Sequence, residues 1–136
     1  MFISQCYNLE AEAVWRSMGF HMNILHDSLE LIDVPSLVKK CTDKWYNQTL
    51  CQVNDSVVRL GILQGEYHWH KHDKEDEYFF VLTGKLIIEI EGSDSVELYE
   101  QQGYVVPKGV IHKPSASNKT TVLMVETAGI IPTGNA

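Results

Sequence analysis

The sequence predicts a single all-β domain that follows a short helical extension. From Trp45 onward, apolar and polar residues alternate with a period of two, which is typical of half-buried strands. The alternating runs are short, turn residues separate them, and no long helical pattern lies between them. A chain of 136 residues is long enough to bury one core of its own. Together these features favour an all-β sandwich or barrel.

The N-terminal part of the chain has a different pattern. Residues 8–19, NLEAEAVWRSMG, contain good helix formers, with Asn8 as a capping residue and Gly19 as a stop signal. Residues 33–41, DVPSLVKKC, fit either one helical turn or a short edge segment. We therefore expect a helix near the N-terminus and leave the second segment open.

We expect the chain to have two parts. These are an N-terminal extension with helical character, residues 1–32, and the β domain, residues 33–136. Met22 could itself serve as an initiator, in which case residues 1–21 would be an appendage. The alternative is a terminal helix that docks on the domain.

Seven segments of the β domain carry the strand pattern. Asn54 and Asp55 make a two-residue polar turn between the first two of these segments, which predicts a hairpin. Gly84 follows the third segment, and Gly92 lies between the fourth and the fifth. The chain should therefore form seven or eight short strands, at 47–53, 56–63, 77–82, 85–91, 95–99, 103–107 and 120–126.

Charge and cysteine content exclude several classes of function. The sequence has 18 acidic and 11 basic residues, and the net charge of −7 repels both nucleic acid and anionic lipid. No segment approaches the roughly 18 apolar residues that a membrane span requires. Cys6, Cys41 and Cys51 are odd in number and form no C-x-x-C pair, which favours a reducing compartment. We expect a cytoplasmic protein without nucleic-acid or membrane partners.

Histidines occupy every second position at the start of the segment HWHKHDKEDEYFF. In an extended chain, residues two apart lie on the same face, about 6.6 Å from each other. His70 and His72 would then direct their imidazoles into the same interior. His68 would lie on that face as well, one pleat deeper, as a residue that supports the site or faces a substrate.

Two further residues can reach the same point. Glu77 follows the polar stretch DKED and opens the next strand. Pro107 and Gly109 make a tight turn that delivers His112 at the start of the following segment. Three imidazole nitrogens and one carboxylate suit iron, manganese, nickel, cobalt or zinc better than magnesium or calcium. The sequence therefore predicts one divalent transition metal per chain.

The spacing of these residues resembles the two-part signature of the cupin superfamily, H-x-H, then four residues, Glu, six residues, Gly, and later P-x-G-x-x-H. Residues 33–136 are similar to small single-domain cupins of the mannose-6-phosphate isomerase-like type. This resemblance implies a cupin jelly-roll β-barrel and a homodimer. Gln101 and Ala116 depart from the usual pattern. The implied metal ligands are His70, His72, Glu77 and His112.

A second register has to be weighed against this ligand set. His68 and His70, followed by four residues, lead to Glu75 with the same local spacing. Only the register that ends in Glu77 leaves six residues before Gly84, the glycine that ends the strand. We therefore prefer the later register.

A metal with four protein ligands keeps open positions for water or a bidentate oxygen ligand. Three functions fit such a site. The first is an isomerase or epimerase of a sugar-like or hydroxycarbonyl compound, with His68 or Glu66 as the candidate catalytic base. The second is a non-haem iron dioxygenase. The third is a metal-dependent small-molecule sensor without turnover, and fold alone does not choose among them.

The positions of the cations bear on the substrate. A phosphorylated sugar needs Arg or Lys near the metal, because a desolvated dianion requires charge-assisted partners. Alternation within their segments places Arg59 and Lys85 on the outer face. Only Lys108 and Lys113, on either side of the last histidine, could reach the mouth of the barrel. We therefore predict that mannose 6-phosphate is not the physiological substrate and that a neutral or carboxylate-bearing hydroxycarbonyl compound fits better.

Overall fold

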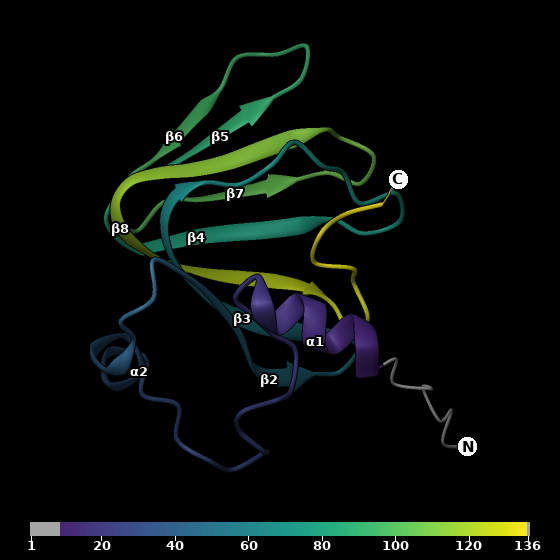
Figure 1. The fold of residues 1–136 in the computed structure, drawn as a ribbon. Helices are drawn as coiled ribbons and strands as arrows, with labels where there is room; N and C mark the ends of the chain where they lie inside the picture. Colours follow the sequence, from purple (N-terminus) through teal and green to yellow (C-terminus); the bar gives the residue numbers. More distant parts are fainter. Residues whose placement is uncertain (1–8, 136) are drawn as a thin grey trace.

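The computed structural model describes residues 9–135, which contain two helices and eight strands (Figure 1). None of the helices in this range is long and apolar enough to cross a membrane. The helices are α1 (Leu9–Ser17) and α2 (Val34–Lys40). The strands are β1 (Phe20–His21), β2 (Trp45–Val53), β3 (Ser56–Glu66), β4 (Glu77–Thr83), β5 (Leu86–Ile90), β6 (Val96–Leu98), β7 (Gly103–Val106) and β8 (His112–Thr127).

Both helices have clear local causes. Helix α1 lies within the predicted segment and ends before Gly19, whose φ of +88° is a conformation that glycine adopts easily. A side chain at Gly19 would collide with the carbonyl oxygen of Trp45. The Asn8 cap that we expected lies outside the described residues. Asp33 caps α2 by accepting a hydrogen bond from the amide of Ser36, so residues 33–41 take the helical alternative.

The strands form a jelly roll with β8 at its centre. The pairing order is β1-β2-β3-β8-β4-β7, and β5 branches from β8 and pairs with β6. Strand β8 bends sharply, so that its first half lies along β5 and its second half lies between β3 and β4 (Figure 1). The hairpin predicted at Asn54 and Asp55 joins β2 and β3. In the part of the chain described here, no pairing links β1 to β7, so a closed barrel is not formed.

The apolar side chains form two separate clusters. The main core lies inside the jelly roll and includes Phe79, Val81 and Ile88. A second cluster, Leu50, Leu60 and Ile62, packs on the other face of the sheet against residues of α2 and its flanking segments. Strand β3 is therefore buried on both faces.

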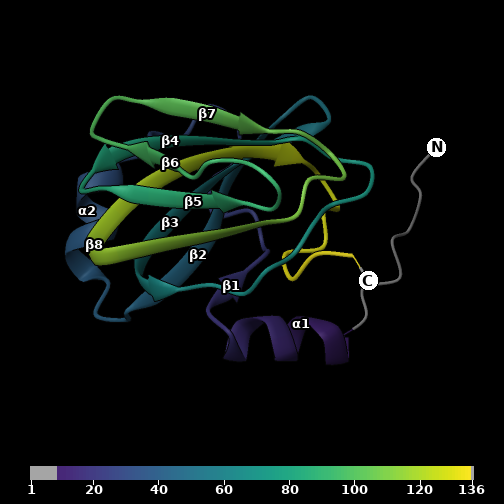
Figure 2. The ribbon, with the colours of Figure 1, turned by 90° about the horizontal axis from the view of Figure 1, so that it is seen from above.

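The N-terminal extension continues the sheet at the edge of β2. Strand β1 pairs with β2 in parallel, with Phe20 beside Asn47. Beyond β1, the amides of Leu25 and His26 donate to carbonyl oxygens of β2. The extension thus covers an edge strand that would otherwise be exposed. Figure 2 shows α1 and α2 apart from each other, on different sides of the sheet. The division of the chain at residue 33 stays a prediction.

Candidate metal centre

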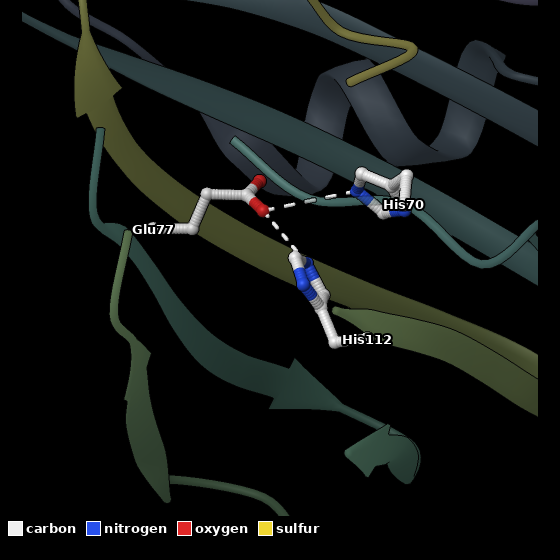
Figure 3. Close-up of side chains that lie close together, drawn as sticks. All are labelled: His70, Glu77 and His112. Carbon is white, nitrogen blue, oxygen red and sulfur yellow. Dashed lines mark hydrogen bonds and ion pairs between the residues drawn. The ribbon is translucent and has the colours of Figure 1, made fainter. Parts of the chain in front are cut away.

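The structure brings the four predicted ligands together around one carboxylate oxygen. The Oε1 atom of Glu77 lies 2.9 Å from Nε2 of His112, 3.2 Å from Nε2 of His72 and 3.9 Å from Nε2 of His70. One ligand atom each from His70, Glu77 and His112 lies within 4.8 Å of the others (Figure 3). All four side chains are buried, with at most 8% of any side chain exposed. His72 borders the group of three.

Backbone pairing sets the positions of the histidines. Glu77 opens β4 and His112 opens β8, whereas His70 and His72 lie in the loop between β3 and β4. His70 and His112 exchange two backbone hydrogen bonds, of 3.0 and 2.9 Å, in an isolated antiparallel bridge. This bridge places their rings 4.3 Å apart between centroids. Within the predicted histidine segment, strand pairing is therefore limited to the bridge at His70.

Hydrogen bonds at Nδ1 fix the tautomers of two histidines. Nδ1 of His70 lies 3.0 Å from the carbonyl oxygen of His68, and Nδ1 of His112 lies 2.9 Å from that of Val110. A carbonyl oxygen only accepts, so each Nδ1 must carry the hydrogen. The Nε2 atom of the neutral imidazole then carries no hydrogen and faces the carboxylate of Glu77. Both the Nε2 atom and the carboxylate oxygen are hydrogen-bond acceptors, so their close approach requires a cation between them. That cation is either a proton or a metal ion.

Burial and hydrogen bonding favour the protonation states that bind metals. Burial lowers the pKa of His70 to about 4, which keeps its imidazole neutral at neutral pH. Burial alone would raise the pKa of Glu77, but the close interactions of its carboxylate with His112 and His72 hold that pKa well below its ordinary value. A neutral imidazole and an ionised carboxylate are the forms that coordinate a metal.

The donor set and its spacing fit a divalent transition metal. Ligand atoms about 2.1 Å from an ion and in adjacent positions lie roughly 3 Å from each other. The separations of Glu77 from His112 and His72, 2.9 and 3.2 Å, match this value. Backbone carbonyls hold the Nδ1–H groups of His70 and His112, as is usual for metal-bound histidines. Nδ1 of His72 is buried and has no partner among the described residues.

The second register does not converge in the same way. Glu75 is partly exposed and lies outside the cluster. His68 is exposed rather than deeper in the fold, and its Nε2 lies 2.9 Å from the carbonyl oxygen of Thr133. The segment leaves the strand geometry on which the deeper position depended. Glu66, the other candidate base, is also exposed and lies 3.7 Å from the ammonium of Lys113.

The comparisons with known proteins agree with this fold. Residues 58–127 match the family model of the cupin domain. The chain belongs to the cupin superfamily. It is 34% identical over 91 residues to the uncharacterized protein YdbB of Bacillus subtilis, an alignment that spans 67% of this chain and 80% of that protein. Assignment to the mannose-6-phosphate isomerase-like type stays a prediction.

Solved structures show the same fold. A cupin-2 domain protein from Shewanella frigidimarina is 30% identical, with a TM-score of 0.67, and the match covers 71% of this chain and 94% of that one. A protein from Neisseria meningitidis is 24% identical, with a TM-score of 0.65, and the match covers 72% of this chain and 99% of that one. Cupins commonly bind a transition metal, which agrees with the donor set of this chain.

The histidine and glutamate cluster of this cupin adjoins a cavity of about 30 Å³. Trp45 and Tyr67 stack in its wall, with ring centroids 5.4 Å apart. The C-terminal segment borders it, because the Tyr67 hydroxyl donates to the carbonyl oxygen of Pro132 over 3.1 Å. Neither His68 nor Glu66 lines the cavity, and their role as base stays a prediction. The lining residues include His70, His72, Glu77, Phe20, Trp45, Asn47, Arg59, Tyr67, Phe79 and Glu126.

The position predicted for Arg59 was wrong. Its side chain is only 1% exposed and lines the cavity, where Nη1 lies 3.6 Å from Oε2 of Glu126. Leu60 and Ile62 face α2 on the outer side of β3, so their apolar character marks a second buried face and not the interior. Because we took only one face of β3 as buried, the alternation placed Arg59 on the wrong side.

Three other residues of the cavity wall were missed. Glu126 and Asn47 are buried polar residues, and Trp45 stands at the start of β2. Glu126, an acidic residue at the end of the apolar segment TTVLMVE, was the one signal in the sequence that could have indicated a polar interior.

The predictions for the lysines agree better with the structure than the prediction for Arg59. Lys85 faces solvent as predicted, with 41% of its side chain exposed, and lies 3.1 Å from Glu97. Lys108 is exposed, whereas Lys113 pairs with Glu89 over 3.1 Å. The ammonium of Lys113 therefore already has a carboxylate partner.

Proposed function

We propose that this cupin binds one divalent transition metal and acts on a small sugar-like or hydroxycarbonyl compound, by isomerisation or epimerisation. The observation that carries the proposal is the convergence of three imidazole Nε2 atoms on Oε1 of Glu77, at the wall of a cavity. The donor set suits iron, manganese, zinc, nickel or cobalt. The proposed ligands are His70, His72, Glu77 and His112.

A bound metal of this kind polarises a carbonyl oxygen and so acidifies the adjacent carbon. The residues of the chain supply the rest of the environment. The backbone carbonyls of His68 and Val110 keep the Nε2 lone pairs of His70 and His112 directed at the site. The stacked rings of Trp45 and Tyr67 line the cavity and restrict water.

Isomerisation also requires a group that moves a proton. His68 and Glu66, the candidates from the sequence, are both exposed. Glu126 lines the cavity and is fully buried. Burial and the negative charge of Glu77 raise the pKa of Glu126 well above its ordinary value, which is the direction that suits a proton-exchanging group. Of these residues, Glu126 is best placed to exchange a proton with a ligand in the cavity.

Solvent-exchange measurements test the proposal directly. The metal-loaded protein is incubated in D₂O with glycolaldehyde, glyceraldehyde or mannose 6-phosphate, and proton NMR follows the hydrogen next to each carbonyl. We expect deuterium to enter one of the first two compounds. The matched control is His112→Ala, which should lose both metal and exchange.

The two alternative functions give different results in the same samples. A non-haem iron dioxygenase would hold iron after purification without added metal and would consume oxygen. A sensor would bind a small molecule without deuterium exchange or oxygen uptake. Exchange in mannose 6-phosphate alone would contradict our expectation about the phosphosugar. Exchange in none of the compounds, together with oxygen consumption, would favour the dioxygenase.

A further inference from the structure

Arg59 has an unused binding edge at the cavity. Its Nε and Nη2 atoms are buried and have no hydrogen-bond partner among the described residues. Glu126 lies 3.6 Å from the third nitrogen, Nη1, and so approaches a different part of the guanidinium. Nε and Nη2 point along the same side of the planar group, which is the side that binds the two oxygens of a carboxylate. The free edge is therefore shaped for a carboxylate.

Two more polar atoms of the same cavity wall are unpaired. Nε1 of Trp45 is a buried donor, and Oδ1 of Asn47 is a buried acceptor, and neither has a partner in the described part of the chain. Buried polar groups in proteins are nearly always satisfied, so a cluster of unpaired ones indicates a ligand. Three donors and one acceptor complement a carboxylate that carries a neighbouring hydroxyl group.

The size of the cavity and its charge favour the same ligand. A volume of about 30 Å³ has room for roughly two or three water-sized groups, so the cavity limits the ligand to a small molecule. A divalent metal and Arg59 supply three positive charges, whereas Glu77 and Glu126, both counted as ionised, supply two negative charges. One positive charge is left, which attracts an anion.

The two charged ends line the same small cavity. Arg59 and Glu77 both belong to its lining, as does Glu126, whose Oε2 lies 3.6 Å from Nη1 of Arg59. A small molecule could therefore contact the guanidinium and the metal centre together.

We propose that the Nε–Nη2 edge of Arg59 binds the carboxylate of a small hydroxy or oxo acid, whose other oxygen faces the metal centre. This inference rests on the proposed function for the role of the metal, and among the compounds which that function allows it favours those that carry a carboxylate. Arg59 is the specificity-determining residue in this arrangement, and Trp45 and Asn47 assist it.

Calorimetric titration of the cobalt-loaded protein tests the inference with three probes. Glycolate has the planar carboxylate and the hydroxyl group, glycolamide lacks the charge, and inorganic phosphate carries its charge on a tetrahedral group. We expect glycolate to bind at least ten-fold more tightly than either of the others. Equal binding of glycolamide would overturn the charged contact, and equal binding of phosphate would overturn the preference of the guanidinium edge for a planar carboxylate.

Variants assign the contact to Arg59. Removing Arg59 alone would leave Glu126 unpaired in the interior, so the informative variant is Arg59→Met combined with Glu126→Gln, with Glu126→Gln as the matched control. We expect the double variant to lose at least ten-fold in glycolate affinity while its cobalt content stays unchanged. Wild-type affinity in the double variant would overturn the inference.

Two further measurements keep the test decisive. If circular dichroism shows that the double variant is unfolded, Trp45→Phe removes one donor and keeps the ring, and it should weaken glycolate binding several-fold. Unchanged affinity in Trp45→Phe would then count against the site. If the wild-type protein binds no cobalt, the proposed function fails. The carboxylate contact at Arg59 is then tested separately, because it predicts weaker binding of glycolate to the metal-free protein that depends on Trp45.

Discussion

The two ends of the cavity contain buried charges that are satisfied to different degrees. At the histidine end, Nδ1 of His70 and of His112 are bonded to backbone carbonyls, and the Nε2 atoms face Glu77. At the other end, Arg59 is equally buried but keeps two nitrogens unpaired. The histidine end is arranged to hold a cation, whereas Nε and Nη2 at the Arg59 end have no hydrogen-bond partner among the described residues. In our proposal, a small carboxylate completes the second end.

The two ends also come from different parts of the fold. The proposed metal ligands are placed by the loop before β4 and by the first residues of β4 and β8. Arg59 lies in the middle of β3, and the ring of Phe20 in the N-terminal extension lies 5.8 Å from its guanidinium carbon. A variant can therefore disturb one end and spare the other, and the following experiments use that separation.

The largest effect is expected from the loss of a metal ligand. Replacing His72 with Ala removes the Nε2 that lies 3.2 Å from Glu77, and we expect metal binding to be abolished. His68→Ala removes an exposed imidazole from the same segment and should leave most of the binding. Metal content by elemental analysis compares the two variants. Equal losses would show that the register is wrong.

The next effect concerns the cover of the Arg59 end. Phe20 is 4% exposed and packs edge-on to Tyr67, with ring centroids 5.8 Å apart. Phe20→Ala leaves a cavity beside Arg59, and we expect it to lower the free energy of unfolding by about 3–5 kcal/mol. Chemical denaturation measures the change, with Val14→Ala, at a residue 57% exposed, as the matched control. Metal affinity should change little in either variant.

The same segment bears on assembly, where a homodimer is our proposal. Light scattering compares the full chain with the chain shortened to begin at Met22. Phe20 is buried within its own chain, so the shortened protein should be less stable even as a monomer. Unchanged mass and unchanged stability would show that residues 1–21 are dispensable.

Protonation of His70 should give a smaller effect on stability. Its pKa is about 4 in the folded protein against 6.5 for an unperturbed histidine, because burial disfavours the charged ring. Below pH 6.5 the unfolded chain takes up a proton that the folded chain does not, so stability falls with pH down to about 4. Over that window we expect the metal-free protein to lose about 2–3 kcal/mol through this residue. Urea denaturation at several pH values measures it.

His70→Gln provides the comparison for the pH experiment. The variant lacks the titrating group, so its stability should depend less on pH between 4 and 6.5. His68→Gln changes an exposed ring and should follow the wild type. An unchanged pH slope in His70→Gln would assign the effect to other groups.

The sequence predicted the histidine end far better than the Arg59 end. The four side chains that the resemblance to cupins indicated lie close together, because spacing along a short segment carries over directly to a loop and to the starts of strands. The strand pattern also located most of the sheet, but it missed β1, which has two residues, and the first half of β8, which contains Pro114 and polar residues. These segments pair through long-range backbone contacts that no local pattern reveals.

The burial of Arg59 could not be predicted from the pattern of β3 alone. Alternation along β3 separates two faces, but it does not tell which face is the interior when both are buried. Helix α2, from a distant part of the sequence, packs on Leu60 and Ile62 and so makes their face of β3 a second buried face. Burial of Arg59 follows from that packing.

The smallest effect is expected at the C-terminal segment, which borders the histidine end. Gly134 has a φ of +87°, and a Cβ there would lie 2.8 Å from Cβ of His70 and 2.9 Å from the carbonyl oxygen of Lys71. Gly134→Ala therefore adds a steric contact with a metal ligand to the ordinary cost of a left-handed backbone. Gly92→Ala is the matched control, because Gly92 has a φ of +74° and nothing within 4 Å of its Cβ position. Each variant should lose about 1 kcal/mol of stability from backbone strain. Only Gly134→Ala should also lower metal affinity, by several-fold, and equal affinities in the two variants would show that the C-terminal segment does not position His70.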